Sequence, residues 1–339
     1  MSFRFWRRIR LLPGVTLNLS KSTASLSFGP PGAKFTLSPR GNRVTAGIPG
    51  TGLFYTVKAS SGQRAGKATR QTAPVTERLD LGFFKRLVTP ANEEAFVDGM
   101  RALHEGDEGT ALKHLENAEG QPDAAWMAGL LRLKRKQFGP AENLLETALA
   151  GEAGLGQMFA KYGLDAVIDL PVTDEITAHI RPCRRGTLVA LAELREARGD
   201  ILAARQTVEA LLGEVPDDIV AMVSLAELML ANSPVSPHDA DAVVRMAAGV
   251  ENETPVHAAL LLYKARALRA LGMDEVAVKT LTQAYRRKKD RPVDLLRQIR
   301  YERALAYADI GRVSRSRQEL EAIYAETPDF ADVRARLGL

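Results

Sequence analysis

Small or apolar residues recur as a triad, at positions i, i+4 and i+7, through the second part of the chain. These three positions share one face of an α-helix. Successive triads begin 30, 63, 36, 37 and 39 residues apart, so the interval of 63 holds one unit with an insertion or a missed repeat. Such a period is typical of stacked helical units, which bury their apolar faces against one another. The six triads are Ala111/Leu115/Ala118, Ala141/Leu145/Ala148, Ala204/Val208/Leu211, Ala240/Val244/Ala247, Ala277/Leu281/Ala284 and Ser316/Leu320/Ile323.

A second predicted helix precedes each triad, and a short turn separates the two. Four of these turns read EGDEG (105–109), RGD (198–200), LGMDE (271–275) and IGRVS (310–314), and their glycines favour a chain reversal. Each preceding helix also carries a small residue, which lets two helix backbones approach closely. The sequence therefore predicts helix–turn–helix units that cross at Gly99, Gly129, Ala192, Ala226, Ala265 and Ala304.

This pattern resembles the tetratricopeptide repeat family over most of residues 92–330. The best units are DAAWMAGLLRLKRKQFGPAENLLETALA (123–150) and GTLVALAELREARGDILAARQTVEALLGEVP (186–216). Related helical-repeat families share the signature. The resemblance implies an all-α, right-handed superhelix with a long concave surface. We expect helical repeats over residues 92–154 and again over 186–339.

An insertion over residues 155–185 is expected to interrupt the helical array. Its central stretch, LDAVIDLPVTDEITAHIRPC (164–183), nearly alternates between apolar and polar residues and is rich in β-branched side chains. This pattern predicts a β-hairpin. The hairpin is either a packing element or a protruding binding element.

The N-terminal region has a different pattern. Residues 1–57 contain short alternating runs such as VTLNLS, separated by GPPG, SPRGN and IPGTG, whose Gly and Pro favour turns. We expect a small all-β module over 1–57, a flexible polar linker over 58–80, and a short connecting helix over 81–91. The chain is thus predicted to be multidomain.

The glycine-rich stretch GIPGTGLFY (47–55) raises the question of a phosphate-binding loop. Gly47 and Gly52 have the separation of a Walker loop, but Leu53 and Phe54 stand where Lys and Ser or Thr are required. The dinucleotide fingerprint fails as well, because its third glycine is missing. The sequence predicts instead a turn that is built by Gly47, Pro49, Gly50 and Gly52.

The same region carries several motifs in a fixed order. They are PGV (13–15), LNLSKS (17–22), RVT (43–45) and GIPGTGLFY (47–55). Together they resemble the small bacterial and phage family of domains of unknown function numbered 4236, over about the first 57 residues. The chain departs from the family pattern at Phe54, where a small polar residue is usual, and at Thr23-Ala24. The resemblance implies no catalytic activity.

Charge is distributed unevenly along the chain. Residues 1–76 contain twelve Arg and Lys but no Asp or Glu, whereas the remainder carries a net charge of −7. A basic surface of this kind binds nucleic acid phosphates or acidic lipid headgroups. Alternatively, it is a solvated charged strand with its aromatic residues in a small core. The candidates for anion contact are Arg4, Arg7, Arg8, Arg10 and Arg43.

Signatures of catalysis and of metal binding are scarce. Cys183 is the only cysteine, so an intramolecular disulfide and a thiolate metal cluster are excluded. The five histidines show no HExxH or HxH spacing, and His179 near Cys183 lacks a third catalytic group. We expect no enzyme activity, metal or cofactor. No apolar run has the roughly 18–20 residues of a membrane span, and no secretory signal follows the start. A cytoplasmic location is expected, with association at a membrane surface as an option.

These observations predict a non-enzymatic adaptor or scaffold. Its repeats bind a protein or peptide, and its basic β module docks on a partner or an anionic surface. The alternative is a protein that associates with nucleic acid or a membrane surface through residues 1–76, with repeats that mediate self-association. The residues predicted to line the partner groove, each of which could instead belong to the core, are Phe96, Trp126, Leu130, Glu193, Glu227, Arg266 and Tyr301.

Overall fold

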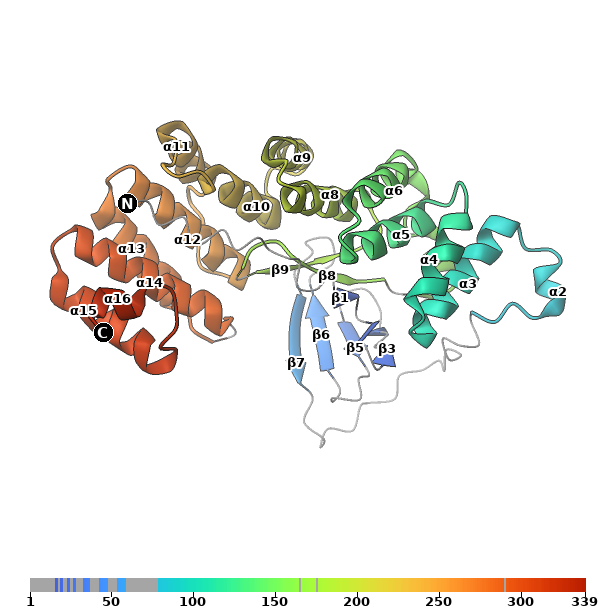
Figure 1. Cartoon of the computed structure of the whole chain (residues 1–339), viewed down its shortest axis with the longest axis horizontal. Coiled ribbons are helices and arrows are strands. Elements are labelled where there is room, and N and C mark those ends of the chain that lie inside the picture. Colours follow the sequence, from blue (N-terminus) through green and yellow to red (C-terminus); the bar gives the residue numbers. More distant parts are fainter. Residues whose placement is uncertain are drawn as a thin grey trace. The chain divides into compact units, whose positions relative to one another are not determined.

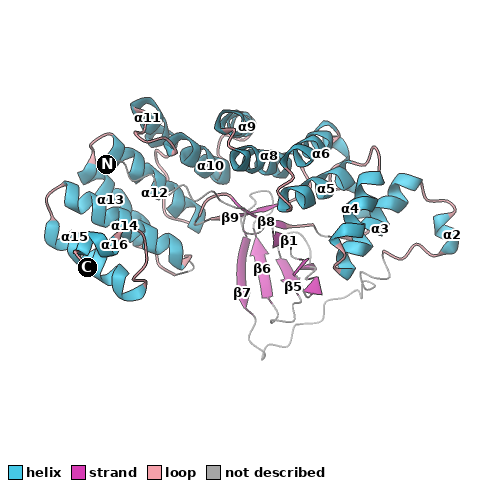
Figure 2. Cartoon of the chain, in the orientation of Figure 1, coloured by secondary structure: helices cyan, strands magenta, loops and turns pink. Residues whose placement is uncertain are grey.

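The structure is a computed structural model that describes residues 79–339, except Asp165, Glu175 and Asp290, together with seven strand segments before them (Figure 1). Helices dominate this part of the chain, as Figure 2 shows. The chain divides into two compact units. Unit 1 comprises Met1–Pro171 and Ala178–Thr207, and unit 2 comprises Val172–Thr177 and Val208–Leu339.

The described N-terminal segments are short strands. β4 pairs with β5, β5 with β6 and β6 with β7, all antiparallel, and β2 pairs with β3. The residues between these strands, and with them the predicted all-β module as a whole, lie outside the described residues. The strands are β1 (Thr16–Leu17), β2 (Leu19–Ser20), β3 (Thr23–Ala24), β4 (Ser27–Phe28), β5 (Ala33–Thr36), β6 (Arg43–Gly47) and β7 (Phe54–Lys58).

The helical part of unit 1 is made of antiparallel helix pairs. The connecting helix predicted over 81–91 is shorter than expected, and α3 begins directly after Pro90, whose carbonyl accepts a hydrogen bond from the amide of Glu94 at 2.9 Å. Within unit 1, α3 packs on α4, α5 on α6, and α8 on α6. The predicted helix–turn–helix units are thus confirmed here. Their helices are α2 (Phe83–Arg86), α3 (Ala91–Glu105), α4 (Glu108–Asn117), α5 (Pro122–Lys134), α6 (Phe138–Ala150), α8 (Arg184–Arg198) and α9 (Ile201–Glu214), the last of which crosses into unit 2.

Two turns reverse the chain by the same local chemistry. After α3, Gly106 adopts φ 86°, and after α8, Gly199 adopts φ 91°, a left-handed conformation that glycine tolerates without a steric penalty. The following aspartate then begins the next helix. Asp107 accepts hydrogen bonds from the backbone of Gly109 and Thr110, and Asp200 accepts one from Ala203. The Gly-Asp pairs of EGDEG and RGD therefore end one helix and cap the next.

The small residues predicted at the helix crossings leave no room for larger ones. A Cβ atom on Gly99 would lie 2.7 Å from Cγ of Leu115, and a Cβ atom on Gly129 would lie 2.8 Å from Cγ of Leu145. The two crossings are equivalent positions of successive units, 30 residues apart. Close approach of the backbones at these glycines positions the second helix of each pair.

The insertion contains more structure than the sequence predicts. The expected β-hairpin is present as β8 (Ile168–Pro171) and β9 (Thr177–Ile180), with β1 paired antiparallel to the other edge of β8. Before the hairpin lie a 3-10 turn, Glu152–Gly154, and a short helix, α7 (Gln157–Lys161), neither of which was expected. The insertion therefore begins with a helical segment.

Unit 2 continues the helix pairs. Here α12 packs on α13 and α14 on α15, and the first helices of successive pairs are neighbours, because α10 contacts α12 and α12 contacts α14. One triad needs correction: Val243, not Val244, is fully buried in α11, so the spacing there is i, i+3, i+7. The helices are α10 (Ile219–Leu230), α11 (Pro237–Met246), α12 (Pro255–Ala270), α13 (Asp274–Tyr285), α14 (Val293–Asp309), α15 (Val313–Glu326) and α16 (Val333–Leu337).

The short helix α16 covers the last helix pair of unit 2. Val333 is fully buried in a cluster with Leu320 and Ile323, and Phe330 stands edge-on to Tyr301 with ring centroids 5.7 Å apart. The Tyr301 hydroxyl donates to Asp332, which also pairs with Arg336. Residues 330–337 thus pack on α14 and α15.

Among the described residues, no helix combines the length and the apolar character that crossing a bilayer requires.

Candidate functional site

Four aromatic side chains of unit 1 form a cluster where α7 meets α3 and α5, the first helices of two successive pairs. Phe159 of α7 stands edge-on to Phe96 of α3, with ring centroids 5.3 Å apart, and edge-on to Trp126 of α5, at 6.2 Å. Tyr162, which follows α7, lies against Phe96 at 6.5 Å. Edge-to-face contacts of this kind stabilise beyond the area that they bury. The cluster joins the insertion to two successive helix pairs.

A buried carboxylate holds the start of α7. Asp123, in the first turn of α5, is 0% exposed and accepts hydrogen bonds from the backbone of Gly156 at 2.5 Å and of Met158 at 2.8 Å. The amide of Phe159 is 3.4 Å away. Burial raises the pKa of Asp123, and the three N–H groups oppose that shift without reversing it. The side chain supplies acceptors for N–H groups that a helix start leaves without partners.

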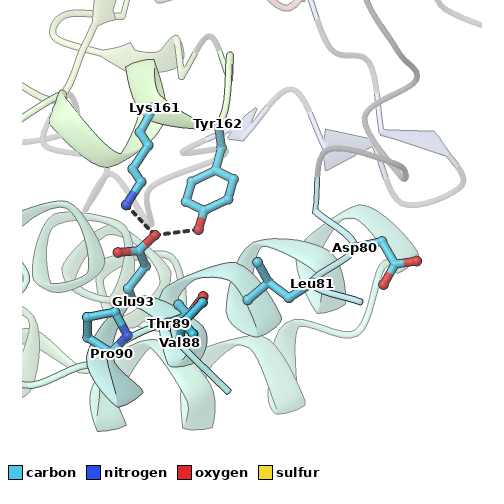
Figure 3. A pocket seen from close by; sticks show the side chains of 8 residues that line it. All are labelled: Asp80, Leu81, Val88, Thr89, Pro90, Glu93, Lys161 and Tyr162. Carbon is cyan, nitrogen blue, oxygen red and sulfur yellow. Dashed lines mark hydrogen bonds and ion pairs between the residues drawn. The ribbon is translucent and has the colours of Figure 1, made fainter. Parts of the chain in front are cut away.

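A second carboxylate holds the end of α7 (Figure 3). Glu93, in the first turn of α3, accepts a hydrogen bond from the Tyr162 hydroxyl at 2.6 Å and pairs with Nζ of Lys161 at 2.5 Å. Burial acts to raise the pKa of Glu93, but the bonds from Lys161 and Tyr162 outweigh it and the net shift is downward. Burial and the bond to Glu93 raise the pKa of Tyr162. Glu93 is therefore a carboxylate with both donors supplied by the insertion.

A cavity of about 360 Å³ opens beside Glu93. Its wall combines the apolar side chains of Leu81, Val88 and Pro90 with the polar side chains of Glu93, Lys161 and Tyr162, as Figure 3 shows. Asp80 and Thr89 complete the lining. The first turn of α3, through Glu93, and the end of α7, through Lys161 and Tyr162, both contribute to this wall.

In unit 2, a buried carboxylate lies between two arginines of a neighbouring first helix. Glu302 of α14 accepts from Nε of Arg266 and from Nη1 of Arg269, each at 2.8 Å. Burial acts to raise the pKa of Glu302, yet the two guanidinium charges lower it overall. Arg266 also lies over the Tyr263 ring, 5.0 Å from its centroid. This network fixes the guanidinium of Arg266 on α12.

The predicted groove residues fall into two groups. Phe96, Trp126 and Leu130 are each 0% exposed, and Glu193 and Tyr301 are also buried. Tyr301 packs beneath the C-terminal residues, as described above. Glu227 and Arg266 are partly exposed on first helices of unit 2. Phe96 and Trp126 thus lie against Phe159, whereas Arg266 and Glu227 in unit 2 keep partial exposure, with Oε2 of Glu227 buried.

The N-terminal candidates lie outside what the structure describes. Arg4, Arg7, Arg8 and Arg10 precede the first strand segment, and the side chain of Arg43 in β6 is not described. In the predicted turn, Pro49, Gly50 and Gly52 are likewise outside the described residues, and Gly47 ends β6. Anion contact through these residues stays a prediction.

His179 and Cys183 make separate contacts and have different structural roles. Nδ1 of His179 in β9 is 2.5 Å from Oδ1 of Asp169 in β8, a contact across the hairpin. Cys183 is the N-cap of α8, where its sulfur accepts from the amide of Gly186 at 3.5 Å. The cysteine therefore serves a helix start in this structure.

Sequence reasoning missed Asp123, Phe159, Tyr162 and Glu302. The sequence does hold a signal for Asp123, because EEAFVDG (93–99) and DAAWMAG (123–129) share an acid, an aromatic residue and a glycine at the same spacing. The contacts of Phe159 and Tyr162 join residues 33 to 69 positions apart in the sequence, and no local pattern encodes them.

Comparisons with known proteins found a family model, a curated relative and solved structures that match this chain. The model of the family "Protein of unknown function (DUF4236)" matches residues 3–56. A curated relative, the cellulose synthase operon protein C of Xanthomonas axonopodis pv. citri (strain 306), is 25% identical over 258 residues. That match covers 74% of this chain and 15% of the relative, so the chain spans a small part of the relative's length.

Solved structures provide further similarity. The N-terminal domain of the EccA1 ATPase from the ESX-1 secretion system of Mycobacterium tuberculosis matches with a TM-score of 0.51 at 18% identity, over 73% of this chain and 88% of that one. A thermophilic TPR protein of Thermus thermophilus matches with a TM-score of 0.40 at 16% identity, over 64% of this chain and 97% of that one. The chain therefore joins an N-terminal segment that matches the DUF4236 family model to a larger region of packed helix pairs.

Proposed function

We propose that this protein is a non-enzymatic adaptor whose helical repeats bind a protein or peptide partner. The observation that carries the proposal is the row of adjacent first helices α10, α12 and α14 in unit 2. In stacked helix pairs such a row forms a continuous face, and its rigidity lets it bind an extended or helical segment with little loss of entropy. We propose as well that the helix pairs follow the right-handed superhelical path predicted from the sequence.

Two side chains on this face give it polar character. Glu227 lies on α10, and Arg266 on α12 has a side chain that is 25% exposed while Glu302 fixes its guanidinium. A preorganised arginine loses little rotamer freedom when it meets a partner, and it can bind carboxylates and aromatic rings. We therefore propose Glu227 and Arg266 as contact residues of the partner groove.

The basic N-terminal segment supports a second candidate function. Twelve positive charges and no acid over residues 1–76 favour binding to nucleic acid or to an anionic membrane surface. In that case the repeats serve self-association. Binding of this kind weakens steeply with salt, because bound counterions are released.

Affinity capture with the full chain separates the two functions. Wild type is compared in nuclease-treated lysate with Glu227→Lys and with a matched control, Glu321→Lys, whose side chain lies 54% exposed on α15. A protein partner that survives nuclease and moderate salt, and is lost only with Glu227→Lys, supports the adaptor. Binding that disappears with nuclease or salt, and with all four of Arg4, Arg7, Arg8 and Arg10 changed to Ala, supports the second candidate instead.

A further inference from the structure

Two successive helix pairs of unit 1, α3–α4 and α5–α6, present the same chemical motif. Glu93, Phe96 and Gly99 in α3 have the spacing of Asp123, Trp126 and Gly129 in α5. In each helix an acid lies in the first turn, an aromatic ring follows one turn later, and the glycine marks the helix crossing. Residues three apart share a helix face, so each acid and its aromatic ring lie on one face.

One segment of the chain engages both copies of the motif. At its start, the amides of Gly156 and Met158 donate to Asp123, and Phe159 contacts Trp126. At its end, Lys161 and Tyr162 bind Glu93. Phe159 lies between the two copies, because it contacts the rings of both helices. Residues 156–162 therefore contact this surface in the way that a bound peptide would.

The short helix depends on this surface for its structure. α7 has five residues, far fewer than the roughly 12–15 that an isolated helix needs in water. Gly156 before it and Gly163 after it both adopt positive φ, so each end of the segment turns sharply away. The segment is therefore a short helix that folds on a surface built by α3 and α5.

We propose that the paired acid–aromatic face of α3 and α5 is a peptide-docking groove, and that residues 156–162 occupy it in cis. Its ligand is a short helix with free N–H groups at its start, an aromatic side chain in its first turn, and Lys and Tyr at its end. A partner segment of this chemistry competes with α7, so the insertion controls access to the groove. This inference rests on the proposed role of the repeats in peptide binding.

The tether sets how strongly the internal segment competes. A segment joined by short connections has an effective concentration on the order of 1 mM. A free copy of the same segment is therefore excluded from the wild-type chain at micromolar concentrations. It binds once the internal copy is removed.

The test uses the full chain with residues 157–162 replaced by a Gly/Ser linker of the same length. A fluorescein-labelled peptide of residues 155–164 is titrated and followed by anisotropy, and the same peptide with Phe159→Ala is the matched control. We expect binding to the linker variant at least 10-fold tighter than to wild type, and at least 10-fold weaker binding of the control peptide. Equal binding to both chains, or none to a linker variant that keeps its helical circular dichroism, overturns the proposal.

A second measurement covers the case in which the linker variant does not fold. Hydrogen exchange of the wild-type chain compares the amides of α7 with those of α3 and α5. Exchange of α7 at least 10-fold faster, through a separate opening, supports a docked segment. Exchange of all three helices together shows that α7 is an integral part of the core and overturns the proposal. Failure here leaves the Glu227→Lys capture unaffected, so it is distinguishable from failure of the proposed function.

Discussion

Phe159 of the insertion meets Trp126 of the second helix pair edge-on, with ring centroids 6.2 Å apart and an interplanar angle of 83°. The indole is 0% exposed, in line with the alternative that Trp126 belongs to the core and not to a partner groove. The insertion supplies a ring against the indole that the sequence pattern does not place there. Part of the surface expected for a partner is thus covered by the chain itself.

Phe159→Ala tests the energy of this contact. Loss of a buried aromatic side chain is expected to lower the free energy of unfolding by about 3 kcal/mol. Phe159→Leu, which keeps most of the apolar volume, is expected to lower it by about 1 kcal/mol. Urea unfolding measures both. In a Trp6→Phe background, acrylamide quenching of the remaining Trp126 should increase for Phe159→Ala, and unchanged quenching would mean that Phe159 does not cover the indole.

Gly129→Ala tests the close helix crossing. The new Cβ atom would lie 2.8 Å from Cγ of Leu145, which has no room to move outward in a buried position. Overpacking costs about 1–3 kcal/mol, and the better helix propensity of alanine returns at most about 1 kcal/mol, so a net loss of about 1 kcal/mol is expected.

Gly213→Ala is the matched control for that substitution. A Cβ atom on Gly213, within α9, meets nothing within 4 Å. Only the propensity effect acts there, and we expect a gain of about 0.5–1 kcal/mol in the midpoint analysis of urea unfolding. If the two substitutions shift stability in the same direction, the crossing at Gly129 is not tightly packed.

Glu302→Gln tests the buried charge network of unit 2. The amide leaves Arg266 and Arg269 without their shared carboxylate, and breaking a buried pair in this way costs about 3 kcal/mol. Glu321→Gln removes an exposed pair with Arg317 on α15 and is expected to cost less than about 0.5 kcal/mol. The pKa of Glu302 is lower in the folded chain than in the unfolded chain. The ionised carboxylate therefore stabilises the fold fully at a pH above the ordinary pKa of a glutamate, and this contribution is lost as the pH falls through the folded pKa.

Chemical denaturation from pH 6 to pH 3 distinguishes this network from general acid effects. The difference in stability between wild type and Glu302→Gln should shrink toward the acid end of the series. A difference that stays constant over the whole range would contradict an ionised Glu302 in the folded state.

Tyr301→Phe tests the packing of residues 330–337 on α14. The change removes the hydrogen bond to Asp332 but keeps the ring against Phe330, so a loss of about 1 kcal/mol is expected at pH 7. Burial and the bond to Asp332 raise the pKa of Tyr301 to about 12. The unfolded chain loses this proton near pH 10, so the contribution of Tyr301 is full below that pH and declines as pH rises toward 12.

The measurement is urea unfolding of wild type and Tyr301→Phe between pH 8 and pH 11.5. The stability of wild type should fall more steeply above pH 10 than that of the variant. Parallel pH profiles would show that the hydroxyl of Tyr301 does not keep its proton through a buried bond.

The features that the sequence predicts correctly are local ones. Gly106-Asp107 and Gly199-Asp200 encode their turns within a few residues, and the glycines at the helix crossings follow from the 30-residue repeat. The hairpin is also local, since alternation over 164–183 determines its two strands. Helix pairs and their order were predictable for this reason.

The remaining features depend on contacts between distant residues. α7 is too short to show helical periodicity, and it forms because Asp123 accepts its first N–H groups. Glu302 looks like any surface acid of a helix until Arg266, 36 residues earlier, is seen beside it. A repeat pattern predicts which residues face a groove, but not which segment of the same chain fills that groove.

Site-specific photo-crosslinking decides whether the first helices of the repeats form a partner-binding face. A benzophenone amino acid is placed in the full chain at Glu227 or Arg266, and at Arg317 on α15 as the control position. We expect discrete protein adducts from Glu227 and Arg266 in native lysate, and none of these adducts from Arg317. The same adducts from Arg317, or no protein adduct from either groove position, would contradict it.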